Sequence, residues 1–313
     1  MQKVLILNGK FKEKIWGGDR LKKEFNYDIN SNSIGEYWAI SAMKDAPSTI
    51  INGDLTGKTL DEVYKDYKGL FANPTEETFP LLVKIIDAKK DLSIQVHPDD
   101  DMAEKLENSR GKTECWYILN DDQSSIIYGL NVDNKNQAID FINNKKRDEV
   151  LREVPARKGD FFFVPAGTVH AIKEGCLILE IQQASDVTYR LYDYDRPDKN
   201  GNLRELHIEK SLEAIRINKT EEKAIVENIE NMVKTTLTSN EFFEVREIKI
   251  KGKQSMIRNK DYLLESVIDG AGELIIDGEK FNIKKGDFFI LTNEVSSYEF
   301  DGDLTIVESN VVR

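Results

Sequence analysis

The sequence predicts a mainly β protein built from two β-barrel domains with a few helical insertions. Most apolar runs between residues 81 and 193 are short, rich in Ile, Val, Phe and Tyr, and separated by turn signals. The run Lys158-Gly-Asp-Phe-Phe-Phe163 returns 127 residues later as Lys285-Gly-Asp-Phe-Phe-Ile290. No stretch approaches the ~20 apolar residues needed to cross a bilayer. Many short strands with turns between them favour a sandwich or barrel.

The expected strands fall in two groups along the chain. The first group is predicted at residues 81–87, 92–96, 114–119, 125–129, 160–164, 176–182 and 187–193. A helical insert is expected at about 136–150. The second group is predicted at residues 263–268, 273–276 and 287–291.

Three further segments are predicted to be helical. Residues 59–70 form an amphipathic pattern that opens with a capping box, Thr59 and Glu62. Asp99, Asp100 and Asp101 follow a proline, and acidic residues there suit the first turn of a helix better than a metal cluster. A helix is also expected at about 204–216, and His207 within it is interpreted as a surface or packing residue.

The repeated motif divides the chain into two domains. Shifting His170 by the 127-residue offset leads to Ser297, and the chain contains no histidine beyond residue 227. We therefore expect residues 1–226 to form the catalytic domain with its helical insertions. Residues 227–313 are expected to form a C-terminal barrel of the same kind without metal ligands.

Composition limits the possible partners. The net charge of −12 argues against general nucleic-acid binding, which needs a basic face. It still allows a small anionic ligand, because basic residues lie in or beside the motif-bearing strands: Lys84, Lys112, Arg190 and Arg196. The start of the chain lacks the apolar stretch of a signal peptide. Cys115 and Cys176 are interpreted as reduced core residues, so a cytoplasmic protein is expected.

A metal site is predicted from three segments. Gln95 and His97 lie two apart in an expected strand and so point to the same face. Glu114 opens a second apolar run, and His170 ends the sequence Pro165-Ala-Gly-Thr-Val-His170 after a third. Amide, imidazole and carboxylate groups that converge would bind a divalent ion, with zinc ranked first. The alternative is a polar, hydrogen-bonded barrel interior without metal.

The same motifs resemble those of a known family. The pattern from Gly159 to His170 resembles the second motif of the cupin superfamily. Together with Gln95-Val-His97-Pro, Lys112-x-Glu114-Cys-Trp and Asp186-x-Thr-Tyr-Arg190, it is similar to type I mannose-6-phosphate isomerase in its short bacterial form. Trp16-Gly-Gly and Gly35-Glu-Tyr-Trp38 fit the same family. The family's Lys-Pro-Glu is Lys112-Thr113-Glu114 here, a change at a position that is not a ligand.

The resemblance implies an aldose–ketose isomerase that interconverts mannose 6-phosphate and fructose 6-phosphate. It implies one Zn²⁺ per chain, held by Gln95, His97, Glu114 and His170. A metal ion would stabilise the enediolate formed when a proton leaves C2. The oligomeric state, the physiological reaction direction and the metal loaded in the cell stay open.

The resemblance also implies Arg190 as an active-site residue, with Lys84, Lys112 and Asp186 around the substrate. Arg190 stays charged and so suits enediolate or phosphate stabilisation. Lys112 could shuttle a proton if burial and the zinc charge lower its pKa. Asp186 and Arg190 share a strand face roughly 13 Å apart, so no salt bridge between them is expected. As alternatives, Lys84 is a strand-edge charge and Asp186 a turn residue.

Two other functions are compatible with a cupin. An iron dioxygenase would present two histidines and a carboxylate in a closely spaced cluster, whereas Gln95 stands where one histidine could be. A non-enzymatic sugar-phosphate-binding regulator would bind its ligand without turnover. An assay for fructose 6-phosphate formed from mannose 6-phosphate separates all three.

Overall fold

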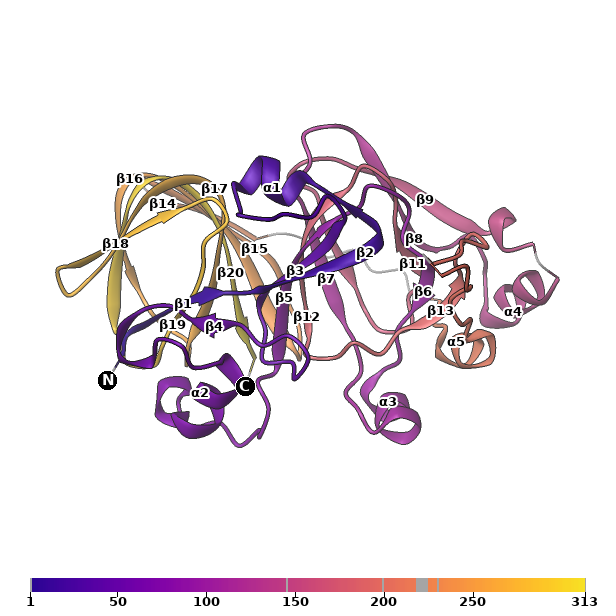
Figure 1. Cartoon of the computed structure of the whole chain (residues 1–313), viewed down its shortest axis with the longest axis horizontal. Coiled ribbons are helices and arrows are strands. Elements are labelled where there is room, and N and C mark those ends of the chain that lie inside the picture. Colours follow the sequence, from indigo (N-terminus) through magenta and orange to yellow (C-terminus); the bar gives the residue numbers. More distant parts are fainter. Residues whose placement is uncertain (1, 145, 199, 218–224, 230, 313) are drawn as a thin grey trace. The chain divides into compact units, whose positions relative to one another are not determined.

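The computed structural model describes residues 2–312 apart from 145, 199, 218–224 and 230 (Figure 1). The chain forms two compact units. Residues 11–37 and 84–221 make the first, which we call the central unit. Residues 1–10, 38–83 and 222–313 make the second, the terminal unit.

The central unit is built on two antiparallel sheets. Within the described residues, the six-stranded sheet has the order β10-β7-β12-β5-β3-β2 and the five-stranded sheet the order β13-β6-β11-β8-β9. The first comprises β10 (Phe161–Val164), β7 (Glu114–Ile118), β12 (Leu177–Gln183), β5 (Leu81–Asp87), β3 (Ile34–Ile40) and β2 (Lys10–Gly18). The second comprises β13 (Tyr189–Tyr192), β6 (Ile94–Val96), β11 (His170–Ile172), β8 (Ser124–Leu130) and β9 (Leu151–Ala156).

Alternation along the strands gives the five-stranded sheet two different faces. Ile94 and Val96 of β6 point to an apolar cluster that also holds Tyr189 and Leu191 of β13. Gln95 between them points to the other face, which we call the inner face. Ile126 of β8 and Ile172 of β11 pack in a second cluster with Trp116 and Ile118 of β7, and this cluster lies on the inner face.

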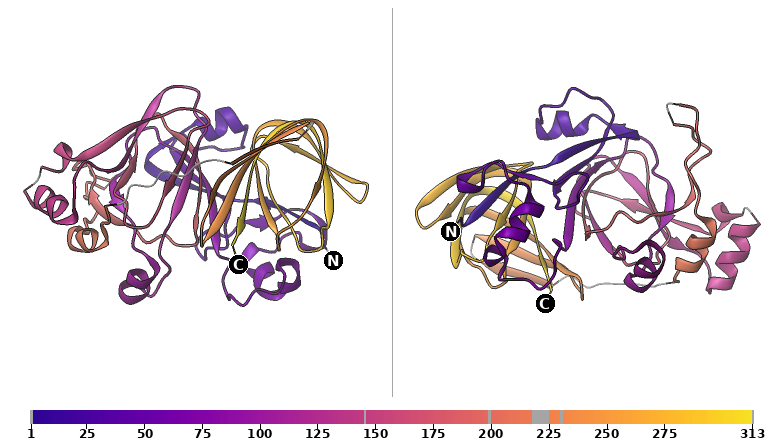
Figure 2. Two further views of the ribbon diagram at one scale, coloured as in Figure 1. Left: turned by 180° about the vertical axis from the view of Figure 1, so that it is seen from behind. Right: turned by 60° about the horizontal axis from the view of Figure 1, so that its bottom comes forward.

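Helices cover the outer face of the five-stranded sheet. Its apolar cluster includes Met102 of α3, Ala138 of α4 and Ala214 of α5. Figures 1 and 2 show α4 and α5 side by side. The helices of the central unit are α1 (Arg20–Phe25), α3 (Asp100–Glu107), α4 (Lys135–Asn143) and α5 (Ile208–Ala214), with the 3₁₀ turn η3 (Arg147–Glu149).

The helix predictions hold best where a cap was visible in the sequence. The Asp99 carboxylate accepts the N–H of Met102 and so starts α3, as predicted. The predicted insert at 136–150 is confirmed as α4, but the helix ends at Asn143. The helix expected at 204–216 begins only at Ile208, because His207 has non-helical backbone angles and is its N-cap.

The terminal unit is built on one sheet. Among the described residues it has nine strands in the order β14-β15-β16-β20-β17-β19-β1-β4, with β18 paired to β17. The strands are β1 (Val4–Asn8), β4 (Thr49–Ile50), β14 (Ile225–Ile229), β15 (Met232–Ser239), β16 (Phe243–Ile257), β17 (Leu263–Ile276), β18 (Glu279–Lys284), β19 (Phe288–Leu291) and β20 (Ser297–Val311). Long β17 covers two strands that the sequence predicted separately.

The segment 38–83 supplies the helical part of the terminal unit. Its helix is α2 (Leu60–Asp66), preceded by η1 (Gly53–Leu55) and followed by η2 (Lys68–Phe71). The predicted capping box of Thr59 and Glu62 is present. Leu60, Val63 and Tyr64 of the predicted apolar stripe are buried, but its fourth member, Tyr67, is exposed because the helix ends at Asp66 and not at residue 70.

The compact units divide the chain differently from the domains 1–226 and 227–313, which remain a prediction. The N-terminal strand β1 pairs with β19, with Val4 opposite Leu291, and with β4 on its other edge. These hydrogen-bonded ladders join residues 1–10 and part of 38–83 to the sheet of the C-terminal strands. No local signal could predict this pairing, because β pairing connects segments nearly 300 residues apart without a local pattern.

The mainly β fold class is confirmed, and so are two expectations from composition. Cys115 and Cys176 are both free and buried. No helix of the described residues is long and apolar enough to cross a membrane. In the central unit the strands β2, β3, β9 and β11 were not predicted, and β9 carries mostly exposed or half-buried residues that leave little apolar signal. In the terminal unit the unpredicted strands are β1, β4, β14, β15, β16, β18 and β20.

Candidate metal centre

Three strands of the five-stranded sheet place polar residues side by side on the inner face. Gln95 of β6 lies opposite His170 of β11 on one side and opposite Arg190 of β13 on the other. Residues directly opposite each other on antiparallel strands point to the same face. The sheet therefore presents a carboxamide, an imidazole and a guanidinium-bearing chain in one row.

The six-stranded sheet contributes a second polar row. Glu114 and Trp116 lie two residues apart along β7 and so point to the same face. Glu180 of β12 lies opposite Trp116. Lys84 of β5 reaches Glu180 with its ammonium group at 3.1 Å. Each of these side chains is buried, so their charges must be compensated within the protein.

The ligand atoms of His97, Glu114 and His170 come together at one buried point. They lie within 4.8 Å of one another, and each residue is about 1% exposed. Glu114 Oε2 lies 3.5 Å from His97 Nε2, and Glu114 Oε1 lies 3.5 Å from His170 Nε2. A tetrahedral ion with bonds of about 2.0–2.1 Å keeps its ligands about 3.3 Å apart. The spacing and the mixed N/O donor set therefore fit a divalent metal ion.

Backbone carbonyls orient both imidazole rings. His97 Nδ1 lies 2.8 Å from the carbonyl oxygen of Val187, and His170 Nδ1 lies 2.9 Å from that of Thr168. A ring nitrogen beside a carbonyl carries the hydrogen and donates it, which leaves the lone pair on Nε2. The two Nε2 atoms are therefore the ones available for a metal.

Gln95 lies at the edge of this cluster. Its amide nitrogen is 3.2 Å from His170 Nε2, and its amide oxygen is 3.4 Å from the hydroxyl of Ser93. A half rotation of the amide group about its last bond exchanges the two atoms and turns the oxygen toward His170. The structure thus places all four predicted ligands together, with the carboxamide as the weakest donor.

Burial adjusts the protonation of these groups. Removal from water lowers the pKa of His97 well below its usual value and that of His170 to about 4. Both rings are therefore neutral at pH 7, as metal ligands must be. Burial, together with the charge of Glu180, raises the pKa of Glu114 to about 7.

Lys112 lies closer to the ligands than the sequence indicated. Its Nζ is 2.8 Å from Glu114 Oε2 and 3.1 Å from His97 Nε2. We expected burial to lower the pKa of Lys112. Burial does act in that direction, but the carboxylates of Glu114 and Glu180 outweigh it and raise the pKa. In the protein without metal, Lys112 is the cation that compensates Glu114.

Glu180 is a member of this site that the sequence analysis missed. Its carboxylate accepts hydrogen bonds from Lys84 Nζ and from the indole N–H of Trp116, both at 3.1 Å. Burial favours a raised pKa, but Lys84 and Lys112 hold the pKa of Glu180 below its usual value. The available signal was a charged residue in an apolar strand that alternates with Leu179 and Ile181.

Lys84 and Asp186 lie in contrasting surroundings. Lys84 is 5% exposed and belongs to β5, which has neighbours on both sides in the sheet, so it is not a strand-edge charge. Asp186 is exposed and precedes β13, and its carbonyl oxygen accepts the hydroxyl of Thr188. Asp186 therefore lies in an irregular segment before β13, and its role stays a prediction.

Arg190 lies apart from the ion pairs of its neighbours. Asp193 forms ion pairs with Arg196 and Arg204. The Arg190 guanidinium instead donates a hydrogen bond through Nη1 to the carbonyl oxygen of Glu205 at 2.8 Å. Asp186 forms no ion pair with Arg190 among the interactions of the described residues, as the sequence predicted.

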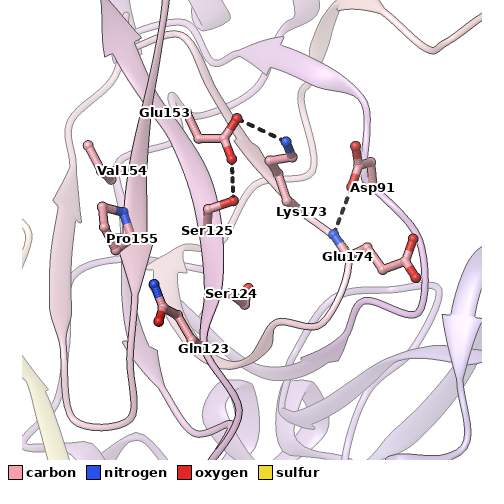
Figure 3. A pocket seen from close by; sticks show the side chains of 9 residues that line it. All are labelled: Asp91, Gln123, Ser124, Ser125, Glu153, Val154, Pro155, Lys173 and Glu174. Carbon is pink, nitrogen blue, oxygen red and sulfur yellow. Dashed lines mark hydrogen bonds and ion pairs between the residues drawn. The ribbon is translucent and has the colours of Figure 1, made fainter.

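A surface pocket of about 760 Å³ lies away from the metal ligands, all four of which are absent from its lining (Figure 3). Three of its four charged side chains already have partners: Glu153, Lys173 and Asp91. The Glu153 carboxylate accepts from Ser125 and Lys173, and the N–H of Glu174 donates to Asp91. The buried cluster, not this pocket, is therefore the candidate site.

A unit of two sheets with a buried N/O donor set on the inner face fits a cupin-type protein with a candidate metal site. The comparisons with known proteins agree. Residues 4–131 match the family described as phosphomannose isomerase type I, catalytic domain. Residues 233–311 match the mannose-6-phosphate isomerase cupin domain.

Relatives cover the whole chain. A mannose-6-phosphate isomerase from Streptococcus mutans is 44% identical over 312 residues, 99% of each chain. The crystal structure of a mannose 6-phosphate isomerase from Bacillus subtilis superimposes with a TM-score of 0.95 at 40% identity, covering 99% of this chain and 100% of that one. A zinc-bound mannose 6-phosphate isomerase has the same fold, with a TM-score of 0.75 at 15% identity and coverage of 100% of both chains.

The chain therefore belongs to the type I mannose-6-phosphate isomerase family. It is an aldose–ketose isomerase, and the buried cluster of His97, Glu114 and His170 is its candidate metal site.

Proposed function

We propose that the enzyme interconverts mannose 6-phosphate and fructose 6-phosphate by zinc-assisted proton transfer through an enediolate. The observation that carries this proposal is the meeting of two imidazole nitrogens and a carboxylate within 4.8 Å on the inner face. One Zn²⁺ per chain would be held by His97, Glu114, His170 and the amide oxygen of Gln95. Bound there, zinc would supply the positive charge that stabilises negative charge on the sugar oxygens.

The buried charges fit an anionic substrate. Lys84 and Lys112 are compensated by Glu114 and Glu180. A divalent ion added to this balanced set leaves an excess of two positive charges. A phosphate monoester carries nearly two negative charges at pH 7, and an enediolate adds more. The site is therefore electrostatically complementary to a sugar phosphate and to the transition state of its isomerisation.

Three residues have distinct proposed roles around the sugar. Arg190 carries a permanent charge next to Gln95 and stabilises the enediolate or the phosphate by two parallel hydrogen bonds. Lys112, whose Nζ lies within reach of the ligand cluster, is proposed to shuttle the proton that leaves C2 and returns at C1. Lys84 contributes positive charge to substrate binding through its place beside Glu180.

Asp186 is proposed as a substrate-binding residue at the rim. Its exposed side chain precedes β13 and is free to accept a hydrogen bond from a sugar hydroxyl. Glu180 holds Lys84 and Trp116 in place. We also propose a cytoplasmic location, since both cysteines are free and reduced.

Chelation tests the proposal. The enzyme is treated with a chelator, and fructose 6-phosphate formed from mannose 6-phosphate is measured before and after zinc is added back. We expect activity to fall to background and to return with one zinc ion per chain. A sample treated with zinc-saturated chelator is the control. Full activity in a preparation shown by elemental analysis to be metal-free contradicts the zinc mechanism, and tight binding without turnover indicates a regulator.

A further inference from the structure

The segment 205–207 holds Arg190 by three hydrogen bonds. The backbone N–H of Arg190 donates to the imidazole Nδ1 of His207 at 3.2 Å. The backbone N–H of His207 donates to the Arg190 carbonyl at 2.8 Å. The Arg190 guanidinium donates through Nη1 to the Glu205 carbonyl, also at 2.8 Å.

The place of Arg190 in the sheet makes these contacts important. β13 is an edge strand, with β6 as its neighbour on one side. Its register with β6 shifts between Arg190 and Tyr192, so the ladder is irregular directly after Arg190. An edge strand at a bulge has few hydrogen bonds to fix its backbone. On the open edge, His207 takes the position that a neighbouring strand would fill.

His207 is itself firmly attached. It caps α5, and its carbonyl accepts both the N–H and the hydroxyl of Ser211. Glu107 of α3 binds Lys210 of α5 at 2.7 Å and the hydroxyl of Tyr189 at 3.1 Å. The helix, the imidazole and strand β13 are therefore joined in one network, and the ring is not a loose surface group.

The imidazole contributes an acceptor at one defined atom. Nδ1 can accept the Arg190 N–H only when the ring is neutral and carries its hydrogen on Nε2. The Glu205 carboxylate lies 3.9 Å from Nε2, on the side of the ring where that hydrogen is found. The side chain is 25% exposed, so its contacts with the protein are made mainly through Nδ1 and the ring face.

We propose that His207 is a positioning residue: through its Nδ1 bond to the Arg190 backbone, it fixes Arg190 in its place opposite Gln95 and so sets the direction of the guanidinium. This inference rests on the proposed function of Arg190 and extends it. Because His207 has no metal-type neighbour in the sequence, it was interpreted as a surface or packing residue. In the structure, the hydrogen bonds to Arg190 give His207 a specific partner.

Substitutions that differ in the acceptor atom test the proposal. In His207→Asn the side-chain oxygen takes nearly the place of Nδ1, whereas in His207→Gln the amide lies one bond farther out, where Nε2 was. We expect His207→Asn to keep nearly normal kcat/KM. His207→Gln and His207→Ala should lose about 10- to 100-fold, the scale of a misplaced catalytic group. Metal content should stay unchanged in all three.

Ser211→Ala is the matched control. It removes the hydroxyl bond to the His207 carbonyl at the same helix start but leaves the bond from Arg190 to Nδ1. We expect a lower melting temperature with unchanged kcat/KM. Equal kcat/KM losses in Ser211→Ala, His207→Asn and His207→Gln would show that only the stability of α5 matters and would overturn the inference.

A double-mutant cycle with Arg190→Ala separates the inference from the proposed function. If His207 acts through Arg190, His207→Ala costs little more once the guanidinium is gone. If Arg190→Ala is damaging and the two losses simply multiply, the positioning role is wrong while the proposed function stands. If Arg190→Ala has wild-type kcat/KM, the role of Arg190 in the proposed function fails, and the positioning role with it.

Discussion

The central and terminal units carry the same local motif, but among the described residues the candidate metal ligands lie in the central unit. In both copies a glycine with positive φ precedes the strand: Gly159 at 87° and Gly286 at 95°. The aspartate that follows accepts the N–H three residues earlier. Asp160 binds Arg157 and Asp287 binds Lys284, each at 2.8 Å. The two units therefore share this turn, and they differ in the side chains that the neighbouring strands contribute.

The strand registers show where the two units diverge. Val164 of β10 lies opposite Glu114 of β7, and Leu291 of β19 lies opposite Leu263 of β17. The position of the carboxylate ligand is thus a leucine in the terminal unit. The position equivalent to His170 is Ser297, which is exposed. The terminal unit therefore has a buried leucine at the first of these positions and an exposed serine at the second.

A buried glutamate survives in both units. Glu180 lies opposite Trp116, and Glu308 lies opposite Glu265 at the matching register. Each glutamate binds a cation on the next strand of its sheet, Lys84 at 3.1 Å or Arg246 at 2.7 Å. The comparison indicates that the buried ion pair belongs to the shared architecture. The candidate metal ligands of the described residues belong to the central unit and have no counterpart at the matching positions of the terminal unit.

The largest expected effect comes from removing a ligand from the central unit alone. In His170→Ala one of two imidazole donors is lost, so metal content should fall toward zero. We expect kcat/KM to drop by at least about 10³-fold, or about 4 kcal/mol of transition-state free energy. Ser297→Ala, at the equivalent position of the terminal unit, should change neither. Stoichiometric zinc and normal turnover in His170→Ala would show that His170 is not a ligand, and two tightly held ions per wild-type chain would show that the terminal unit binds metal too.

A second prediction concerns charge without ligation. Arg190→Lys keeps the positive charge but loses the planar fork, so we expect kcat/KM to fall about 10²- to 10³-fold, or about 3–4 kcal/mol. Zinc content and melting temperature should hardly change, because Arg190 is neither a ligand nor a core residue. Steady-state kinetics with metal analysis checks this. Loss of zinc in this variant would make the role of Arg190 structural.

A third prediction concerns the ion pair of the terminal unit. Arg246→Met leaves Glu308 buried without its cation, and such a loss costs about 3–5 kcal/mol of unfolding free energy. Denaturant unfolding measures it. Lys253→Met on the same strand breaks the exposed pair with Glu299 and should cost much less. If the unfolding free energies of the two variants are the same, the buried pair contributes no more than a surface one.

The smallest expected effect is a change in pH dependence. Both oxygens of Glu265 are buried without a hydrogen-bond partner, and burial, with the nearby Glu308, raises its pKa well above the usual value. Because the pKa of Glu265 is higher in the folded state than in the unfolded state, the protein loses stability as the pH rises above the pKa of the unfolded state. Glu265→Gln should therefore raise the midpoint of denaturant unfolding at pH 8, and it should raise this midpoint by less at pH 5. Equal shifts at both pH values would show that Glu265 does not titrate. Exposed Glu299→Gln is the control.

Local signals in the sequence predicted much of this molecule correctly. The capping box at Thr59, the acidic helix start at Asp99 and the buried strand of residues 81–87 each depend on neighbouring residues, and each is present. The alternation that put Gln95 and His97 on one face rests on the geometry of a single strand. The expected convergence of Glu114 and His170 came from the motifs and the family resemblance together.

The sequence by itself determined the β class, the repeated turn and the identity of the groups able to bind a metal. Only the tertiary structure decided which distant strands pair, and three consequences follow from this. The N-terminal strand β1 joins the C-terminal strands in the sheet of the terminal unit. Glu180 meets Lys84, 96 residues away. His207 meets Arg190 across a loop. Backbone pairing leaves no pattern in the residues it joins, because any residue supplies the same N–H and C=O groups, and only the packed fold selects the partners.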